Sequence, residues 1–174
     1  MTQIFAVHGW AGHAEQWTYW RRLMEQRQWP VQVMERGYGN NAPTQPSWTN
    51  EAGPRVVIAH SLGLHFLPSP LLQEATALVL LGCFTAFVPE GRNGRSTQAG
   101  LKGMRAALGS EAERSMLERF FQRAIQPSPR ELVLLPHSSR ASLQRDGNAS
   151  MTTWSYWKHV EPSLGDGPPM PVFW

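Results

Sequence analysis

The chain has 174 residues, of which 41% are hydrophobic and 17% charged, and its formal net charge is +3. A chain of this length can bury a sizeable core as one domain, and this composition excludes a disordered or fibrous protein. The longest apolar run, residues 75–84, is too short to span a membrane, and no signal-peptide pattern is present. A single cysteine, Cys83, cannot form an internal disulfide. We therefore expect a cytoplasmic protein without membrane contact.

Four short apolar segments predict strands, and helical patterns separate them: the strands are residues 4–7, 31–34, 55–60 and 77–81. Residues 13–28 carry Trp17, Trp20, Leu23 and Met24 at helical spacing, which places them on one face of a helix. Residues 64–72 also have a helical pattern, interrupted by prolines, and residues 40–54 have the composition of a loop. This alternation predicts an α/β fold with a mostly parallel sheet.

The pattern changes after residue 89, where residues 101–125 predict a helix with apolar and charged positions interleaved. A helical insertion at this point would cover the carboxyl edge of the sheet, where open α/β sheets bind ligands. We divide the chain into a core of residues 1–89, a helical cap of residues 90–136 and a tail of residues 137–174. The structure of that tail cannot be derived from its sequence.

Ser61 occupies the turn between a predicted strand and a predicted helix. The surrounding sequence Ala59-His60-Ser61-Leu62-Gly63 matches the G-x-S-x-G nucleophile elbow of α/β-hydrolases, with alanine at the first glycine position. Small residues are needed at both flanking positions because strand and helix crowd together there, and alanine meets that need. The alternative is an ordinary strand-to-helix turn with a capping serine.

A second motif, His8-Gly9-Trp10, follows the first predicted strand. In α/β-hydrolases the loop at this position supplies one backbone N–H of the oxyanion hole, and the residue after the nucleophile supplies the other. We assign these donors to Trp10 and Leu62. His8 is interpreted as a histidine that structures the turn rather than as a base. The two motifs in this order favour a serine hydrolase.

Together with Trp17 and Gly37-Tyr38-Gly39, these motifs give the first half of the chain a resemblance to a known family. The chain resembles the esterases of biotin synthesis that act on pimeloyl-[acyl-carrier protein] methyl ester. The resemblance implies an α/β-hydrolase fold with a helical cap, carboxylesterase activity in the cytoplasm, and a small or carrier-bound acyl ester as substrate. That chemistry needs no metal or organic cofactor.

The cap region is basic, because residues 92–145 hold ten Lys or Arg against four Asp or Glu. Such a surplus is typical of a solvated helical surface, and it also suits a docking face for an acidic partner. The resemblance makes an acyl carrier protein that partner, with Arg114, Arg119 and Arg123 as candidate contacts. The basic residues are dispersed and no nucleic-acid-binding motif is present, so we expect no nucleic acid partner.

The base of a catalytic triad is the open question in the sequence. Chain order in this fold is serine, then an acid, then histidine. His65 follows the elbow too closely to face Ser61, which leaves His137 and His159; Asp146 with His159 has the required order. Alternatively, residues 169–174 begin the strand that should precede the acid, and the chain is incomplete at its C-terminus, or the tail is divergent.

Three functional hypotheses therefore remain. The first is a carboxylesterase that forms an acyl-enzyme on Ser61, with His159 as the candidate base. The second is a catalytically impaired hydrolase or binding module that lacks the acid and base of the triad. The third is a thioesterase or lipase on the same fold, because a fold does not determine the substrate. The oligomeric state cannot be derived from the sequence.

Overall fold

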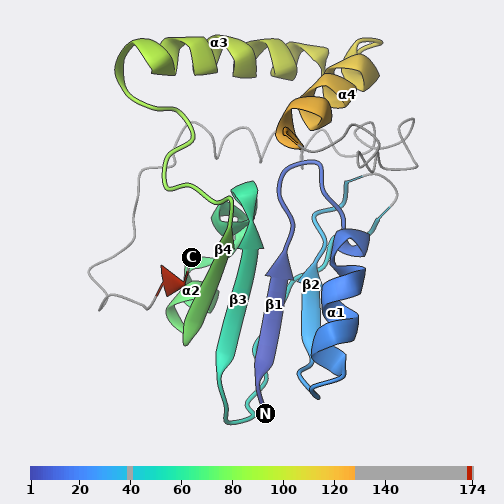
Figure 1. Cartoon of the computed structure of the whole chain (residues 1–174), viewed down its shortest axis with the longest axis vertical. Coiled ribbons are helices and arrows are strands. Elements are labelled where there is room, and N and C mark those ends of the chain that lie inside the picture. The colour runs from blue at the N-terminus through green and yellow to red at the C-terminus, as the bar shows by residue number, and fades with distance from the viewer. Residues whose placement is uncertain (39–40, 128–171, 174) are drawn as a thin grey trace.

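A parallel sheet of five strands forms the centre of the computed structural model, which describes residues 1–38, 41–127 and 172–173. The strand order is β2 (Val31–Met34), β1 (Gln3–Val7), β3 (Arg55–His60), β4 (Ala77–Leu81) and β5 (Val172–Phe173). All neighbouring strands run parallel, so their carboxyl ends lie at one edge (Figure 1). The predicted α/β class and its parallel sheet are confirmed, and β2, β3 and β4 have the predicted bounds.

The order of the strands creates a switch point between β1 and β3. The chain passes from β1 to β2 on one side of β1 and then returns to β3 on the other side. In open α/β sheets, the crevice outside the carboxyl ends of the strands at such a point is the usual ligand site. The residues that follow β1 and β3 are those of the two sequence motifs, His8 and Ser61 onward.

Apolar clusters cover the two faces of the sheet. On one face, alternate strand residues pack against the segment after β3, in a cluster that includes Phe5, Val57, Leu62 and Phe66. On the other face, the cluster contains Ile4, Ala6, Trp17 and Ile58. Because both faces are covered, β1 is buried along its whole length, which explains why its residues 4–7 are continuously apolar rather than alternating.

The segment after β1 differs from its prediction. Instead of one helix over residues 13–28, the chain forms a 3-10 turn, η1 (Ala14–Trp17), followed by α1 (Thr18–Glu25). Trp17 is buried, whereas Trp20 is 45% exposed and contacts Tyr19 edge to face. The prediction that Trp20 lies on one helix face with Trp17 is wrong, because Trp17 ends η1 and Trp20 lies within α1, so no single helix carries both residues.

The segment after β3 is also divided. A 3-10 helix, η2 (Ser61–Phe66), comes first, and α2 (Ser69–Gln73) follows with Pro70 in its first turn. The interruption agrees with the prolines noted in the helical pattern of residues 64–72, because proline is tolerated only in the first turn of a helix.

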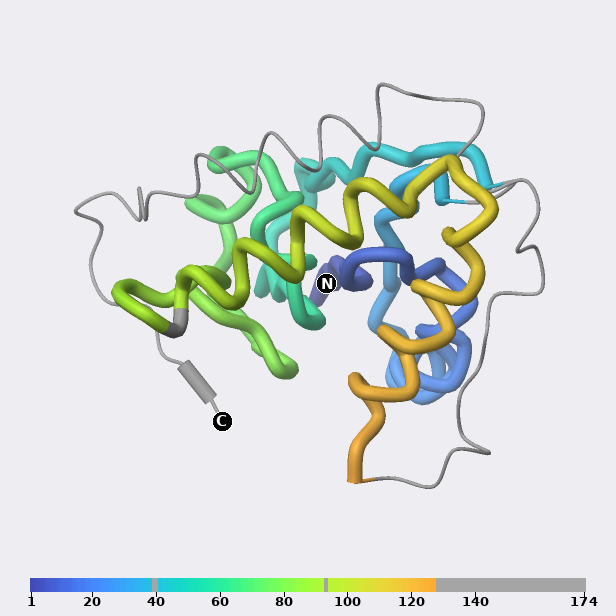
Figure 2. Tube along the Cα trace, turned by 90° about the horizontal axis from the view of Figure 1, so that it is seen from above, coloured from blue at the N-terminus to red at the C-terminus, as the bar shows by residue number. Residues whose placement is uncertain are grey.

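The predicted cap helix is two helices. These are α3 (Gly91–Ala107), which begins well before residue 101, and α4 (Glu113–Ala124). Gly109, with φ of +74°, lies between them, and its N–H donates to Glu113 Oε2 at 2.6 Å. Both helices lie beyond the carboxyl ends of β1, β3 and β4 (Figures 1 and 2).

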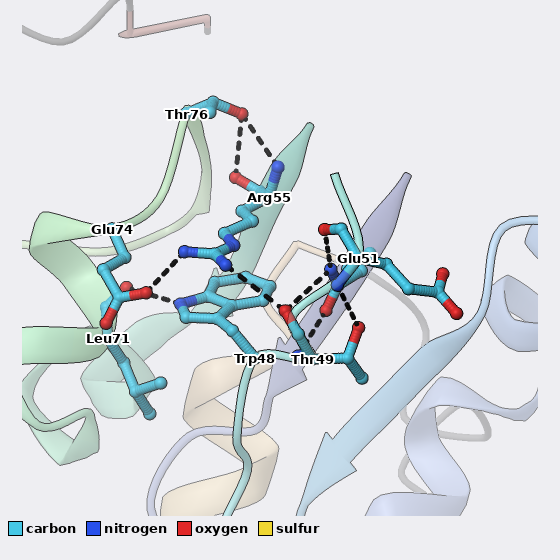
Figure 3. A network of polar contacts seen from close by, with 8 residues as sticks. Trp48, Thr49, Glu51, Arg55, Leu71, Glu74 and Thr76 are labelled. Carbon is cyan, nitrogen blue, oxygen red and sulfur yellow. Dashed lines mark hydrogen bonds and ion pairs between the residues drawn. The ribbon is translucent and has the colours of Figure 1, made fainter. Parts of the chain in front are cut away.

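A network of contacts around Trp48 holds the loop between β2 and β3 against the sheet (Figure 3). The Trp48 ring stacks on Phe5 at a centroid distance of 3.9 Å, and its Nε1–H donates to Leu71 O. Arg55 lies over the same ring and forms an ion pair with Glu74. The network lies towards the amino end of β3, away from Ser61.

The charged surface of α4 is partly neutralised within the helix, because Arg114 forms an ion pair with Glu118 at 3.0 Å. Arg119 and Arg123 are exposed on the same helix. None of the helices in the described residues has both the length and the apolar character needed to cross a membrane.

Candidate active site at the carboxyl ends of β1 and β3

Ser61 adopts a backbone conformation that is rare for a residue with a side chain. It follows the last residue of β3 directly and has φ of +54°. Non-glycine residues with positive φ are uncommon and cluster at functional sites, where the surrounding structure compensates the strain. Ser61 is partly buried, so its side chain is accessible at the edge of the sheet. This is the backbone geometry expected of a nucleophile elbow.

The residues that flank Ser61 explain why small side chains are required there. Ala59 is fully buried within β3. A Cβ atom added to Gly63 would lie 2.8 Å from the carbonyl oxygen of Val7 and 2.9 Å from that of His8. Both contacts are with backbone, which cannot move aside without disturbing β1. The glycine therefore permits the close approach of η2 to the end of β1.

Gly9 brings the first sequence motif against the serine. A Cβ atom on Gly9 would lie 3.0 Å from Ser61 Cβ and 3.5 Å from Ser61 Oγ. The loop after β1 and the turn after β3 therefore meet at these two residues. The two sequence motifs therefore adjoin in space.

Trp10 lies in a tight turn directly after Gly9. The Gly12 N–H donates to Gly9 O at 3.2 Å, and Ala11 has φ of +56°, as the third residue of a type II turn does. Within the described residues the Trp10 N–H has no hydrogen-bond acceptor. Leu62 N–H lies in the first turn of η2, where a helix offers no acceptor of its own. Both predicted oxyanion donors are thus N–H groups at the switch point.

The Trp10 ring connects this turn to the cap. It packs edge to face against Phe120 of α4, at a centroid distance of 5.0 Å and an interplanar angle of 87°. Edge-to-face pairs of this kind are favourable because the positive edge of one ring meets the negative face of the other. The candidate oxyanion turn therefore contacts helix α4 of the cap directly.

Glu35, the residue after β2, was not among the sequence candidates. It is buried, and its Oε1 lies 3.3 Å from Nε2 of the fully buried His8. Burial alone raises the pKa of Glu35, but His8 and the N–H groups of Ala14 and Arg36 outweigh it, so the net pKa lies below the usual value. A polar residue directly after a predicted strand, at the same edge as His8 and Ser61, was the available signal.

The histidines of the described residues do not supply a base to Ser61. His65 Nε2 lies 2.7 Å from Phe84 O, and His13 lies 3.7 Å from Glu15. His60 is exposed; partial desolvation lowers its pKa, and the charge on His8 acts in the same direction. No hydrogen bond joins the Ser61 hydroxyl to any of these rings or to His8. His137, Asp146 and His159 lie outside the described residues, so the choice of His159 stays a prediction.

Cys83 also lies near this edge, after β4. Its thiol donates to Ala59 O at 3.2 Å, and burial raises the pKa of the thiol. A protonated, hydrogen-bonded thiol is a structural group rather than a nucleophile. Across the described ranges, no cluster of three or more His, Cys, Asp or Glu residues suited to a metal ion is found.

Comparison of the chain with protein-family models, with curated proteins and with solved structures finds no match in any of the three. We therefore infer the function from the geometry of the site.

Proposed function

We propose that the chain is a serine hydrolase of the α/β-hydrolase class, a carboxylesterase with Ser61 as its nucleophile. The observation that carries the proposal is the positive φ of Ser61 at the end of β3, packed directly against Gly9. Strand order adds support, because the serine lies at the switch point of a parallel sheet. The cap helices α3 and α4 beyond this edge are in keeping with a covered hydrolase site (Figure 2).

In the proposed reaction, Ser61 Oγ attacks the carbonyl carbon of the ester and its proton passes to a histidine, for which His159 is the candidate. The N–H groups of Trp10 and Leu62 stabilise the oxyanion. Collapse of the tetrahedral intermediate expels the alcohol, which takes the proton from the histidine, and leaves an acyl group on Ser61. Water then hydrolyses this acyl-enzyme with the same histidine as base. No cofactor enters the reaction.

The resemblance to esterases of biotin synthesis suggests the substrate, an acyl methyl ester carried by an acidic acyl carrier protein in the cytoplasm. Exposed arginines on α4 support a docking role for the cap. A thioesterase or lipase would use the same serine and the same oxyanion donors, so the substrate class must be decided by assay.

A second candidate is a hydrolase-like binding protein without the acid and base. It is favoured by the observation that, among the residues described, Ser61 has no histidine partner. Such a protein would retain the elbow while its serine hydroxyl stayed a weak nucleophile.

Hydrolysis of p-nitrophenyl acyl esters and of the matching thioesters tests these proposals. We expect ester hydrolysis that falls by at least about 10³-fold in Ser61→Ala and in His159→Ala. Ser69→Ala, an exposed serine at the start of α2, is the matched control and should retain wild-type rates. If His137→Ala abolishes turnover and His159→Ala does not, His137 is the base. A folded wild-type protein with no esterase or thioesterase activity would favour the binding protein.

A further inference from the structure

His8 and Glu35 form a buried pair beneath the turn that carries Trp10. The His8 ring is fully buried, and each of its nitrogens faces an oxygen atom: Nδ1 lies 2.9 Å from Gly9 O, and Nε2 lies 3.3 Å from Glu35 Oε1. The second contact has the distance of an ion pair without the alignment of a hydrogen bond. The Glu35 carboxylate therefore lies directly against a ring that is shielded from solvent.

Glu35 connects two loops through its carboxylate. Oε2 accepts the N–H of Ala14, at 2.9 Å, just beyond the turn after β1. Oε1 accepts the N–H of Arg36, also at 2.9 Å, and faces His8. One buried carboxylate therefore fixes the loop after β1 against the end of β2. The contacts with His8 and Ala14 hold the chain before and after Trp10.

The His8 ring also restricts the backbone of the turn formed by residues 9–12. A Cβ on Gly12 would lie 3.1 Å from His8 Nδ1 and 3.0 Å from His8 Cβ, so the ring packs closely against this residue. Gly9 O accepts the Gly12 N–H and faces His8 Nδ1 as well. Gly9 and Gly12 are the two ends of the turn, with Trp10 between them. A shift of the ring would shift both ends.

We propose that Glu35 is a positioning residue, which holds the His8 ring beneath the Gly9–Gly12 turn and thereby fixes the Trp10 N–H beside Ser61. The effect of Glu35 on the reaction rate of Ser61 rests on the proposed esterase function, whereas its effect on the position of the turn does not. The acidic side chain acts through His8 and through the N–H groups of Ala14 and Arg36 rather than through contact with substrate.

The first test is the rate at which a fluorophosphonate probe labels Ser61 in the full chain. Glu35→Gln keeps the shape of the side chain and removes its charge. We expect the maximal labelling rate to fall about tenfold to a hundredfold, with little change in the probe concentration at half-maximal rate. The matched control is Glu74→Gln, which breaks the ion pair with Arg55 at the other end of β3. It should label within about twofold of wild type.

The second test does not require activity. Nitrogen-15 NMR of the His8 ring should give the same signals in the wild type and in Glu74→Gln, and shifted signals in Glu35→Gln. The amide signals of residues 9–12 should move in Glu35→Gln alone. Unchanged ring and amide signals in Glu35→Gln would overturn the inference. If Glu35→Gln does not fold, Glu35→Asp, whose carboxylate cannot reach as far, replaces it with the same expectations for the amides and the labelling rate.

The proposed hydrolase function and the positioning role of Glu35 can be contradicted independently of each other. A wild-type protein that the probe does not label contradicts the proposed hydrolase, and the NMR comparison then decides the role of Glu35 by itself. Normal labelling of Ser61 in Glu35→Gln contradicts the positioning role and leaves the hydrolase proposal intact.

Discussion

Gly9 and Ser61 are in such close contact that a Cβ atom on the glycine would lie 3.0 Å from the Cβ of the serine. These residues stand at the start of two different segments, one after β1 and one after β3, which the parallel pairing of the strands brings to the same edge. The contact sets the distance between the proposed nucleophile and the proposed oxyanion donor at Trp10. It makes Gly9 the most sensitive position for a conservative substitution.

Gly9→Ala should slow fluorophosphonate labelling of Ser61 by about tenfold or more, because the added methyl group must displace the serine or the turn. Stability should fall by roughly 1–3 kcal/mol, the usual range for overpacking. Gly103→Ala is the control, since a Cβ there meets no atom within 4 Å. It should leave labelling unchanged and stabilise α3 by up to about 1 kcal/mol. Equal labelling rates in the two variants would contradict the close contact.

The buried Glu35 predicts a specific pH dependence of stability. Its folded-state pKa lies below the ordinary value of 4.5, so its contribution to stability is complete above that value and is lost as pH falls through the folded pKa. Glu35→Gln should cost roughly 1.5–3 kcal/mol at neutral pH, the usual range for hydrogen bonds to a charged group, because the carboxylate accepts the N–H groups of Ala14 and Arg36. Urea unfolding at several pH values measures this. The difference between wild type and variant should shrink below pH 4.5; a constant difference would show that Glu35 is not charged in the fold.

Trp48 stabilises the fold without serving the site. Trp48→Phe retains the stacking on Phe5 but loses the hydrogen bond to Leu71 O, so we expect a loss of about 0.5–1.5 kcal/mol. Trp48→Ala should cost roughly 3–5 kcal/mol. Urea unfolding measures both. Labelling of Ser61 under native conditions should be the same in Trp48→Phe as in wild type, and a large drop would mean that the network reaches the site.

The exposed arginines of α4 test the docking hypothesis. Arg119→Glu combined with Arg123→Glu should raise the KM for an ester bound to acyl carrier protein, about tenfold at low salt, and leave hydrolysis of a free p-nitrophenyl ester unchanged. Arg21→Glu with Arg27→Glu, on and just after the distant helix α1, is the control of equal charge. An equal effect of both pairs, or no effect of either, contradicts docking on the cap.

The strands and the two motifs could be predicted because their signals are local. Each strand is a short apolar segment bounded by polar or turn residues, and the elbow places small residues around Ser61 for steric reasons that hold in any parallel sheet. The division of the cap into α3 and α4 was harder to predict. Apolar residues continue at helical spacing through Leu108, and the break depends on the backbone of Gly109.

The parts of the site that were missed depend on tertiary contacts. Trp20 has helical spacing from Trp17, yet Trp17 ends η1 and is buried, whereas Trp20 lies in α1 and is exposed. Glu35 carries no motif of its own, and only the pairing of β1 with β2 brings it to His8. His159 and His137 lie outside the described residues, so the base stays a prediction of the sequence.

Peptide mapping of the full chain after reaction with a fluorophosphonate tests most directly whether Ser61 is an activated nucleophile. We expect one phosphonylated residue, Ser61, and no adduct on that peptide in Ser61→Ala. The hydroxyl groups of Ser69 and Ser47 are internal controls, because both residues are exposed but neither has the strained backbone of an elbow. A folded wild-type protein that is unmodified at Ser61, or modified equally at these other serines, would contradict the claim that Ser61 is an activated nucleophile.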